Sequence, residues 1–205
     1  NGKLLKQEVK QISGVVNATL SSFVPSGTRR WRNFISTNEN TFQTEFWPID
    51  EDYINTMGMH LLKGRNFSGK LATDSLAVLI NEAAAKTFAY SDNDPLNKKI
   101  SYGNNEYTIV GVVKDFNFNS FSEKVGPVVM LMPADIRKMQ GDNSDALCVR
   151  MNAADISGVL ENIEQIWKKM SPSKPFNYSF MDEQFDALYR TEQRMGQLFI
   201  IFTVF

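Results

Sequence analysis

The sequence has very few of the residues that most often carry chemistry, with one cysteine and one histidine among 205 residues. Because Cys148 is alone, the chain can form no intrachain disulfide and no cysteine-based metal cluster. A zinc site or a Ser-His-Asp triad would have to use His60, and no Gly-x-Ser-x-Gly elbow accompanies it. The phosphate-binding patterns Gly-x-x-x-x-Gly-Lys-Ser/Thr and Gly-x-Gly-x-x-Gly are also absent. We therefore predict no catalytic, cofactor-binding or metal-binding residue, and no cofactor.

Neither sign of charge is in excess, since 22 lysines and arginines face 23 acidic residues for a net charge of −1. A nucleic-acid surface needs a basic excess or a dense basic stripe, so no nucleic-acid partner is expected. The nearest approach to one is Arg29-Arg30-Trp31-Arg32, which we interpret as a solvated loop. Contact of this cluster with phosphate or lipid headgroups is the alternative. A hydrophobic content of 42 % with 15 phenylalanines indicates a folded domain with a substantial core.

Two acidic clusters are explained by helix starts. Asp50-Glu51-Asp52 stands before Tyr53 and an apolar turn that ends at Gly58, which predicts a short helix over 50–58 with Asp50 as its cap. A calcium loop is the competing interpretation, but its alternating oxygen ligands and central glycine are missing. Asp182 and Glu183 likewise suit a helix start better than the paired acids of a glycosidase.

The remaining residues with reactive or metal-binding side chains are expected to be packing residues. Met57-x-Met59 and Met130-x-Met132 could in principle hold copper, but no histidine or cysteine pattern supports them. Cys148 lies between apolar residues of a predicted strand, and His60 lies in another short strand.

Hydrophobic periodicity predicts alternating helices and strands along the chain. Predicted helices cover 3–12, 50–58, 82–89 and 155–170, with Asn81 and Asp155 as caps of the last two, and a final helix begins at Asp182. Predicted strands cover 15–23, 41–49, 59–62, 76–80, 100–102, 107–115, 128–132, 146–151 and 176–180.

The last eight residues, 198–205, are seven apolar residues and one threonine. A membrane-spanning helix needs about 20 mostly apolar residues, so this run alone cannot span a bilayer. We interpret residues 191–205 as the start of a transmembrane helix, with a buried terminal strand or helix as the alternative. No leader precedes Asn1, so the chain is expected to be part of a longer protein.

Several segments resemble one family in their content and order. The first is Phe46-Trp47-Pro48 through Tyr53-Ile54-Asn55-Thr56-Met57-Gly58 to Gly64-Arg65-Asn66-Phe67, and the others are 78–84, 94–100, 109–116 and 178–190. Together they resemble the MacB-like periplasmic domain of FtsX-type ABC transporter permeases. The resemblance covers roughly residues 12–205 and implies an α+β fold, in which a porter-like subdomain of βαβ units carries an inserted β-rich subdomain. We expect residues 1–70 with 140–190 to form the former and 71–139 the latter.

The resemblance also implies a function. The domain would lie in the periplasm between two transmembrane helices of an inner-membrane protein and transmit ATP-driven conformational change without catalysis of its own. Implied partners are an ABC ATPase subunit, a second permease copy, the membrane through flanking helices, and a periplasmic accessory protein as a further candidate. The alternatives are an extracytoplasmic sensor or ligand-binding domain and, behind it, a hydrolase. We expect the isolated chain to be monomeric.

Overall fold

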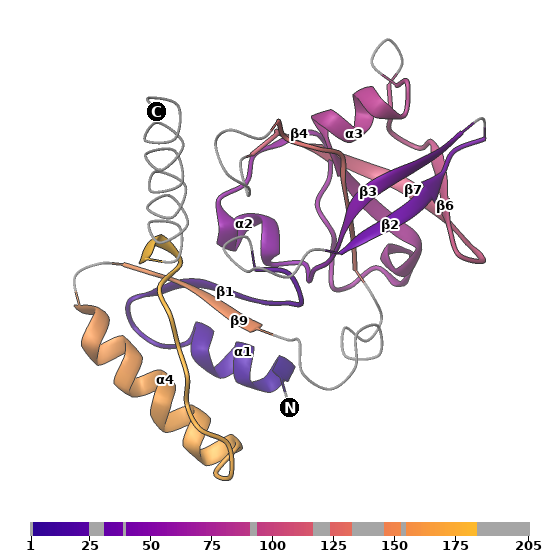
Figure 1. The fold of residues 1–205 in the computed structure, drawn as a ribbon. Coiled ribbons are helices and arrows are strands. Elements are labelled where there is room, and N and C mark those ends of the chain that lie inside the picture. Colours follow the sequence, from indigo (N-terminus) through magenta and orange to yellow (C-terminus); the bar gives the residue numbers. More distant parts are fainter. Residues whose placement is uncertain are drawn as a thin grey trace, which may run out of the picture.

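A computed structural model describes residues 2–24, 31–38, 40–90, 94–116, 124–132, 146–152 and 155–183. The described chain forms two groups of elements (Figure 1). One is a small α/β unit built from both ends of the chain, and the other is a barrel of strands from its middle. The predicted α+β fold class is thereby confirmed. No helix within these ranges is long and apolar enough to cross a membrane.

The small unit consists of two strands and two helices. Strand β1 (Val15–Ser21) pairs antiparallel with β9 (Ala146–Met151), so that Thr19 lies opposite Cys148. Helices α1 (Gly2–Lys10) and α4 (Ile156–Met170) pack on this pair through a core of five buried residues, Leu5, Val9, Ala18, Val159 and Ile163. We call these four elements the two-stranded unit. Asp155 caps α4 as predicted, because its carboxylate accepts the Gly158 N–H at 3.0 Å.

The barrel contains seven strands in the order β4-β7-β5-β8-β3-β2-β6, and β6 pairs again with β7. The strands are β2 (Arg32–Ser36), β3 (Thr41–Pro48), β4 (Leu61–Gly64), β5 (Ala77–Asn81), β6 (Lys99–Tyr102), β7 (Asn105–Val113) and β8 (Val128–Leu131). Because the pairings return to β7, six strands close into a ring. The seventh, β4, pairs with the last three residues of β7, beyond the part that pairs with β6.

Side-chain alternation sends the barrel residues into two separate cores. On β5, Val78 and Ile80 enter the inner core, while Leu79 belongs to an outer core that packs beneath helix α2 (Tyr53–Met57). In that outer core Trp47 stacks on Phe23 with ring centroids 3.8 Å apart. The outer core therefore lies between the barrel wall, α2 and the end of the segment that leaves β1.

Helix α3 (Glu82–Thr87) and the 3-10 helix η1 (Ala72–Leu76) flank β5. The predicted cap Asn81 is confirmed, since its side-chain oxygen accepts the Ala84 N–H at 2.9 Å. The same oxygen accepts the Val128 N–H at 2.8 Å, and the amide nitrogen donates to Asp115 at 2.8 Å. One asparagine thus joins β5, α3, β7 and β8.

One predicted strand is wrong, and one strand of the structure was not predicted. Residues 176–180 are extended but join neither sheet, because period-two alternation reports an extended backbone and not its pairing. Strand β2 was missed, because it has a single fully buried residue, Ile35, and a polar sequence.

The barrel takes strands from both sides of residue 70, where the family resemblance implies a subdomain boundary. Strands β2, β3 and β4 lie between residues 32 and 64, within the expected first part of the porter-like subdomain (1–70), yet they pair into the barrel. Their partners β8 and β7 come from the range 71–139, because the barrel closes only when both stretches contribute. The predicted start of a transmembrane helix, residues 191–205, lies outside the described residues.

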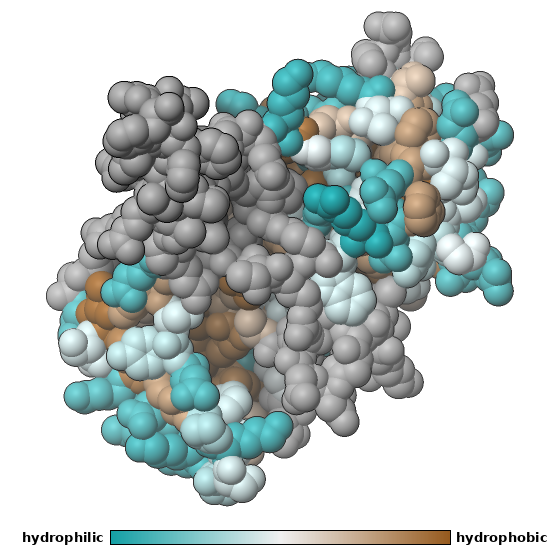
Figure 2. All heavy atoms as spheres, viewed as in Figure 1, coloured by the Kyte–Doolittle hydropathy of each residue, from teal (hydrophilic) through white to brown (hydrophobic). Residues whose placement is uncertain are grey.

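The surface is apolar in places beside the two-stranded unit. Figure 2 shows brown, apolar side chains gathered next to α4 and the strand pair, with hydrophilic side chains around them. Val16 and Tyr178 belong to the large apolar or aromatic residues that are more than half exposed.

Two glycines in left-handed conformations test the barrel geometry. Gly64 (φ +72°) ends β4 so closely against β7 that an added Cβ would lie 2.2 Å from the Val110 carbonyl oxygen. Gly103 (φ +59°) turns between β6 and β7, and nothing lies within 4 Å of its added Cβ.

We expect Gly103→Ala to cost only about 1–2 kcal/mol of unfolding free energy, the penalty of the left-handed backbone. Gly64→Ala should cost about 3 kcal/mol or more, because the clash with β7 is added. Urea unfolding of both variants checks this, and equal losses would contradict the tight β4–β7 approach.

Candidate functional site

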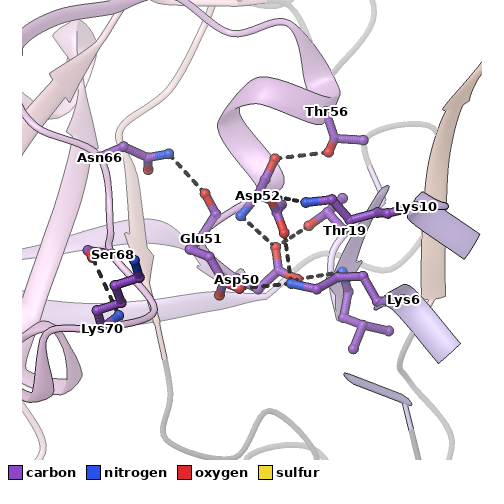
Figure 3. Close-up of polar contacts among 11 residues, drawn as sticks. Lys6, Lys10, Thr19, Asp50, Glu51, Asp52, Thr56, Asn66, Ser68 and Lys70 are labelled. Carbon is purple, nitrogen blue, oxygen red and sulfur yellow. Dashed lines mark hydrogen bonds and ion pairs between the residues drawn. The ribbon is translucent and has the colours of Figure 1, made fainter. Parts of the chain in front are cut away.

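The most unusual polar feature of the described chain is a buried lysine surrounded by three carboxylates. The Lys6 ammonium group, from α1, lies 2.9 Å from a carboxylate oxygen of each of Asp50, Glu51 and Asp52 (Figure 3). These acids form the turn between β3 and α2. Lys10, one turn further along α1, pairs with Asp52 at 2.8 Å. We call these five residues the Lys6 cluster.

Asp50 extends the cluster to β1. Its carboxylate accepts the Leu20 backbone N–H at 2.8 Å and the hydroxyl of Thr19. It also accepts the Asp52 N–H at 3.0 Å, at the start of α2. The predicted capping role of Asp50 is therefore only part of its function, because its other contacts reach α1 and β1. The N-cap position itself is occupied by Asp52, whose side chain makes no capping hydrogen bond.

The second turn residue, Glu51, binds the barrel side of the junction through its backbone. The Glu51 carbonyl accepts the Asn66 side-chain amide at 3.0 Å, and Asn66 follows β4. The turn is therefore held by α1 and β1 on one side and by the barrel on the other (Figure 3).

Burial makes this cluster electrostatically strong. The Lys6 and Asp50 side chains are only 7 % and 8 % exposed, so water screens their attraction little. Burial alone would lower the pKa of Lys6, but hydrogen bonds to Asp52, Asp50 and Glu51 outweigh it and raise the pKa above its usual range. Burial would raise the pKa values of Glu51 and Asp52, yet the lysines hold both below their usual range. Lys6, Glu51 and Asp52 are therefore charged at neutral pH.

The Lys6 cluster connects separate elements of the chain through charge pairs. Because Lys6 pairs with all three carboxylates, none of them is left free as a ligand for calcium. Within the described ranges, no group of three or more His, Cys, Asp or Glu side chains is arranged to hold a metal ion. What the Lys6 cluster does is join α1 and β1 of the two-stranded unit to the turn that leaves the barrel.

The other residues that the sequence singled out do not lie together in the structure. His60 is exposed just before β4, and its carbonyl accepts the Lys114 N–H at 2.8 Å. Asp182 is exposed and accepts the N–H of Glu183 at 2.9 Å. Arg32 pairs with Glu45 at 3.1 Å, whereas residues 29 and 30 of the basic cluster lie outside the described residues.

The methionine and cysteine positions are packing sites. Met130 is fully buried in the outer core, and Met57, Met59 and Met132 pack against that core. Cys148 lies in β9 opposite Thr19, and burial followed by the charge of Asp50 raises the pKa of its thiol to about 11.

Sequence reasoning treated Asp50, Glu51 and Asp52 as local capping residues and did not single out Lys6 or Lys10. The signal available was the pairing of lysines at i and i+4 on one amphipathic helix with a run of three acids elsewhere. Nothing local connected the two, because 44 residues separate Lys6 from Asp50.

Comparisons with known proteins agree with this architecture. A family model, the MacB-like periplasmic core domain, matches residues 2–166. The periplasmic region of MacB from Actinobacillus actinomycetemcomitans has a TM-score of 0.65 at 16 % identity, covering 91 % of this chain and 82 % of that one. The extracellular domain of the noncanonic ABC-type transporter YknZ from Gram-positive bacteria has a TM-score of 0.60 at 15 % identity, covering 84 % of each chain. No curated protein matches the sequence.

The buried ion pairs predict a large and specific loss of stability. Lys6→Met leaves three neighbouring carboxylates without their shared cation, so the unfolding free energy should fall by about 3–5 kcal/mol. Lys63→Met is the matched control, because Lys63 and Asp94 form a 3.7 Å pair that is more than half exposed. Its loss should be below about 1 kcal/mol. Urea unfolding at pH 7 measures both, and a similar small loss in the two variants would contradict the energetic role of the cluster.

The raised pKa of Cys148 predicts that its thiol is alkylated slowly. At pH 8 the folded chain should react with iodoacetamide on the order of a hundredfold more slowly than an ordinary cysteine, because so little Cys148 is thiolate. A mass-spectrometric time course gives the rate, with the chain unfolded in guanidinium as its own reference. Equal rates in the folded and unfolded chain would contradict the raised pKa of Cys148.

Proposed function

The chain belongs to the MacB-like periplasmic core domain family, and from that premise we propose that it is the periplasmic domain of an ABC transporter permease and transmits ATP-driven movement. In this proposal it performs no chemical step. It converts a displacement of α1 into a displacement of the barrel.

The observation that carries the proposal is the Lys6 cluster. A movement that enters through α1 acts directly on Lys6 and Lys10, and both are bound to the turn from which α2 begins. Since α2 packs against the outer core with Tyr53 and Ile54, the turn cannot shift without the barrel wall. A buried, multiply bonded ion-pair network resists shear, whereas a single exposed pair would give way.

The placement of the chain ends supports the same direction of transmission. The first described residues form α1, and the last, 155–183, form α4 and the segment after it, so both belong to the two-stranded unit or follow it (Figure 1). The described strands of the barrel all come from residues between them. If both ends continue into membrane helices, as the family resemblance implies, the two-stranded unit lies nearest the membrane and the barrel is the moved part.

The partners follow from this role and concern the whole protein. An ABC ATPase subunit would supply the driving force, and a second permease copy would supply the opposing domain. A periplasmic accessory protein is a further candidate. The division of strands between two separate sheets supports transmission over the alternative of a sensor with a single enclosed site.

The test uses the full-length permease with its ATPase in lipid bilayers. A spin label at Asn104→Cys, in the exposed turn between β6 and β7, reports the distance between the barrels of two copies, with Cys148 replaced by Ala. We expect ATP to change this distance in the parent and in Lys63→Met. In Lys6→Met the change should be lost while ATP hydrolysis continues, because the motor is intact but α1 no longer holds the turn.

Lys6→Arg serves as the second variant, since it keeps a positive charge at this position and should retain the ATP-dependent distance change. Circular dichroism of each purified variant confirms folding. The proposal falls if folded Lys6→Met moves its barrel as the parent does.

A further inference from the structure

A hollow of about 660 Å³ lies between β9, α4 and the extended segment 175–181. Its volume is within the range of about 300–1,000 Å³ that is typical of small-molecule sites. Its walls are mainly apolar and aromatic, and Figure 2 shows apolar side chains gathered at this part of the surface. We call it the β9 groove. Representative lining residues are Leu147, Val149, Ile163, Trp167, Phe176 and Phe180.

The outer wall of the groove, segment 175–181, is tied to α4 at its start. The Trp167 indole N–H donates to the Lys174 carbonyl at 3.1 Å, which ties the end of α4 to the start of the extended segment. Along that segment the rings of Phe176, Tyr178 and Phe180 contact one another in turn, with successive centroids 5.7 Å apart and tilted or edge-on planes. Tyr178 remains 59 % exposed, so an aromatic face is open to a ligand. Three methionines add adaptable surface, namely Met57, Met151 and Met181.

One charged side chain stands in this apolar lining. Arg150 is the only ionisable cation among the described lining residues, and no aspartate or glutamate is among them. Within the described part of the chain no carboxylate pairs with Arg150. Its guanidinium group lies against Gly58, where an added Cβ would be 2.7 Å from a guanidinium nitrogen. The Arg150 side chain is exposed, and its guanidinium group lies beside the end of α2 at the edge of the groove.

We propose that the β9 groove binds a single-chain anionic amphiphile, with the apolar chain between β9 and segment 175–181 and the anionic head on Arg150. The apolar walls select the chain, because each methylene removed from water is stabilised there. The lone guanidinium selects a carboxylate or similar anion, which it can bind with two parallel hydrogen bonds. Binding at this site is testable apart from the proposed transmission of movement, since it requires neither ATP nor a second copy.

Dodecanoate, used below its critical micelle concentration at pH 7.5, is the probe. Isothermal titration calorimetry with the 205-residue chain should give one site, and the Trp167 indole resonance should shift in nitrogen–proton NMR spectra. Decanoate should bind on the order of tenfold more weakly, about fourfold for each methylene removed. Dodecanol, which has the chain without the charge, should lose at least about tenfold.

The variants assign the site. Arg150→Gln should weaken dodecanoate about tenfold or more and bring it to the affinity of dodecanol, because the charge-assisted hydrogen bonds are lost. Lys169→Gln removes the same charge from an exposed position on α4 outside the groove and should leave the affinity unchanged. Tyr178→Ala, also at an exposed position, should weaken dodecanoate and dodecanol alike.

Three results would overturn the proposal. The first is no dodecanoate binding to the folded parent chain below the micelle concentration. The second is an affinity that Arg150→Gln and Lys169→Gln change equally, which would indicate non-specific charge attraction. The third is a saturable shift that leaves the Trp167 indole unmoved, which would locate the ligand elsewhere.

Discussion

The burial of one ammonium group constrains the junction of this domain more than any other contact. A lysine that is nearly excluded from water is stable only with anionic partners, and Lys6 has three, all from one turn. The turn can supply three acids side by side only because Lys6 and Lys10 neutralise most of their mutual repulsion. The position of α1 on β1 and the start of α2 thus depend on each other, and neither has a stable alternative with these charges unpaired.

Apolar packing holds α2 against the barrel wall, and the ion pairs of the Lys6 cluster fix its orientation. The outer core fills the space between the barrel wall and α2, and the stacked pair of Phe23 and Trp47 brings the end of the β1 segment into it. Such packing is non-directional, so several orientations of α2 would bury similar area. Hydrogen bonds from Thr19 and the Leu20 backbone to Asp50 select one of them. The junction is therefore both tightly packed and fixed in register.

Sequence reasoning succeeded where the determinants are local and failed where they are not. The caps Asn81 and Asp155, the apolar strand β5 and the periodic helix α4 were predictable because each rests on neighbours a few residues away. The ring closure through Ser36 and Ser101 and the contact of Lys6 with Asp50 join distant segments, and no periodic pattern reports them. Residues 176–180 show the converse error, since their alternating aromatics predict a strand but carry no information about a partner. The family resemblance supplied the architecture that local patterns could not.

The two-stranded sheet gives the Lys6 cluster and the β9 groove a common support. Thr19 on β1 binds Asp50 of the cluster, and its partner across the sheet, Cys148 on β9, lines the groove. Within the described residues this sheet has only these two strands, so the cluster and the groove lie on adjacent strands. A ligand that binds the groove more tightly in one position of α1 than in another must therefore favour that position. By the same linkage, a movement of α1 must change the affinity of the groove by an equal factor.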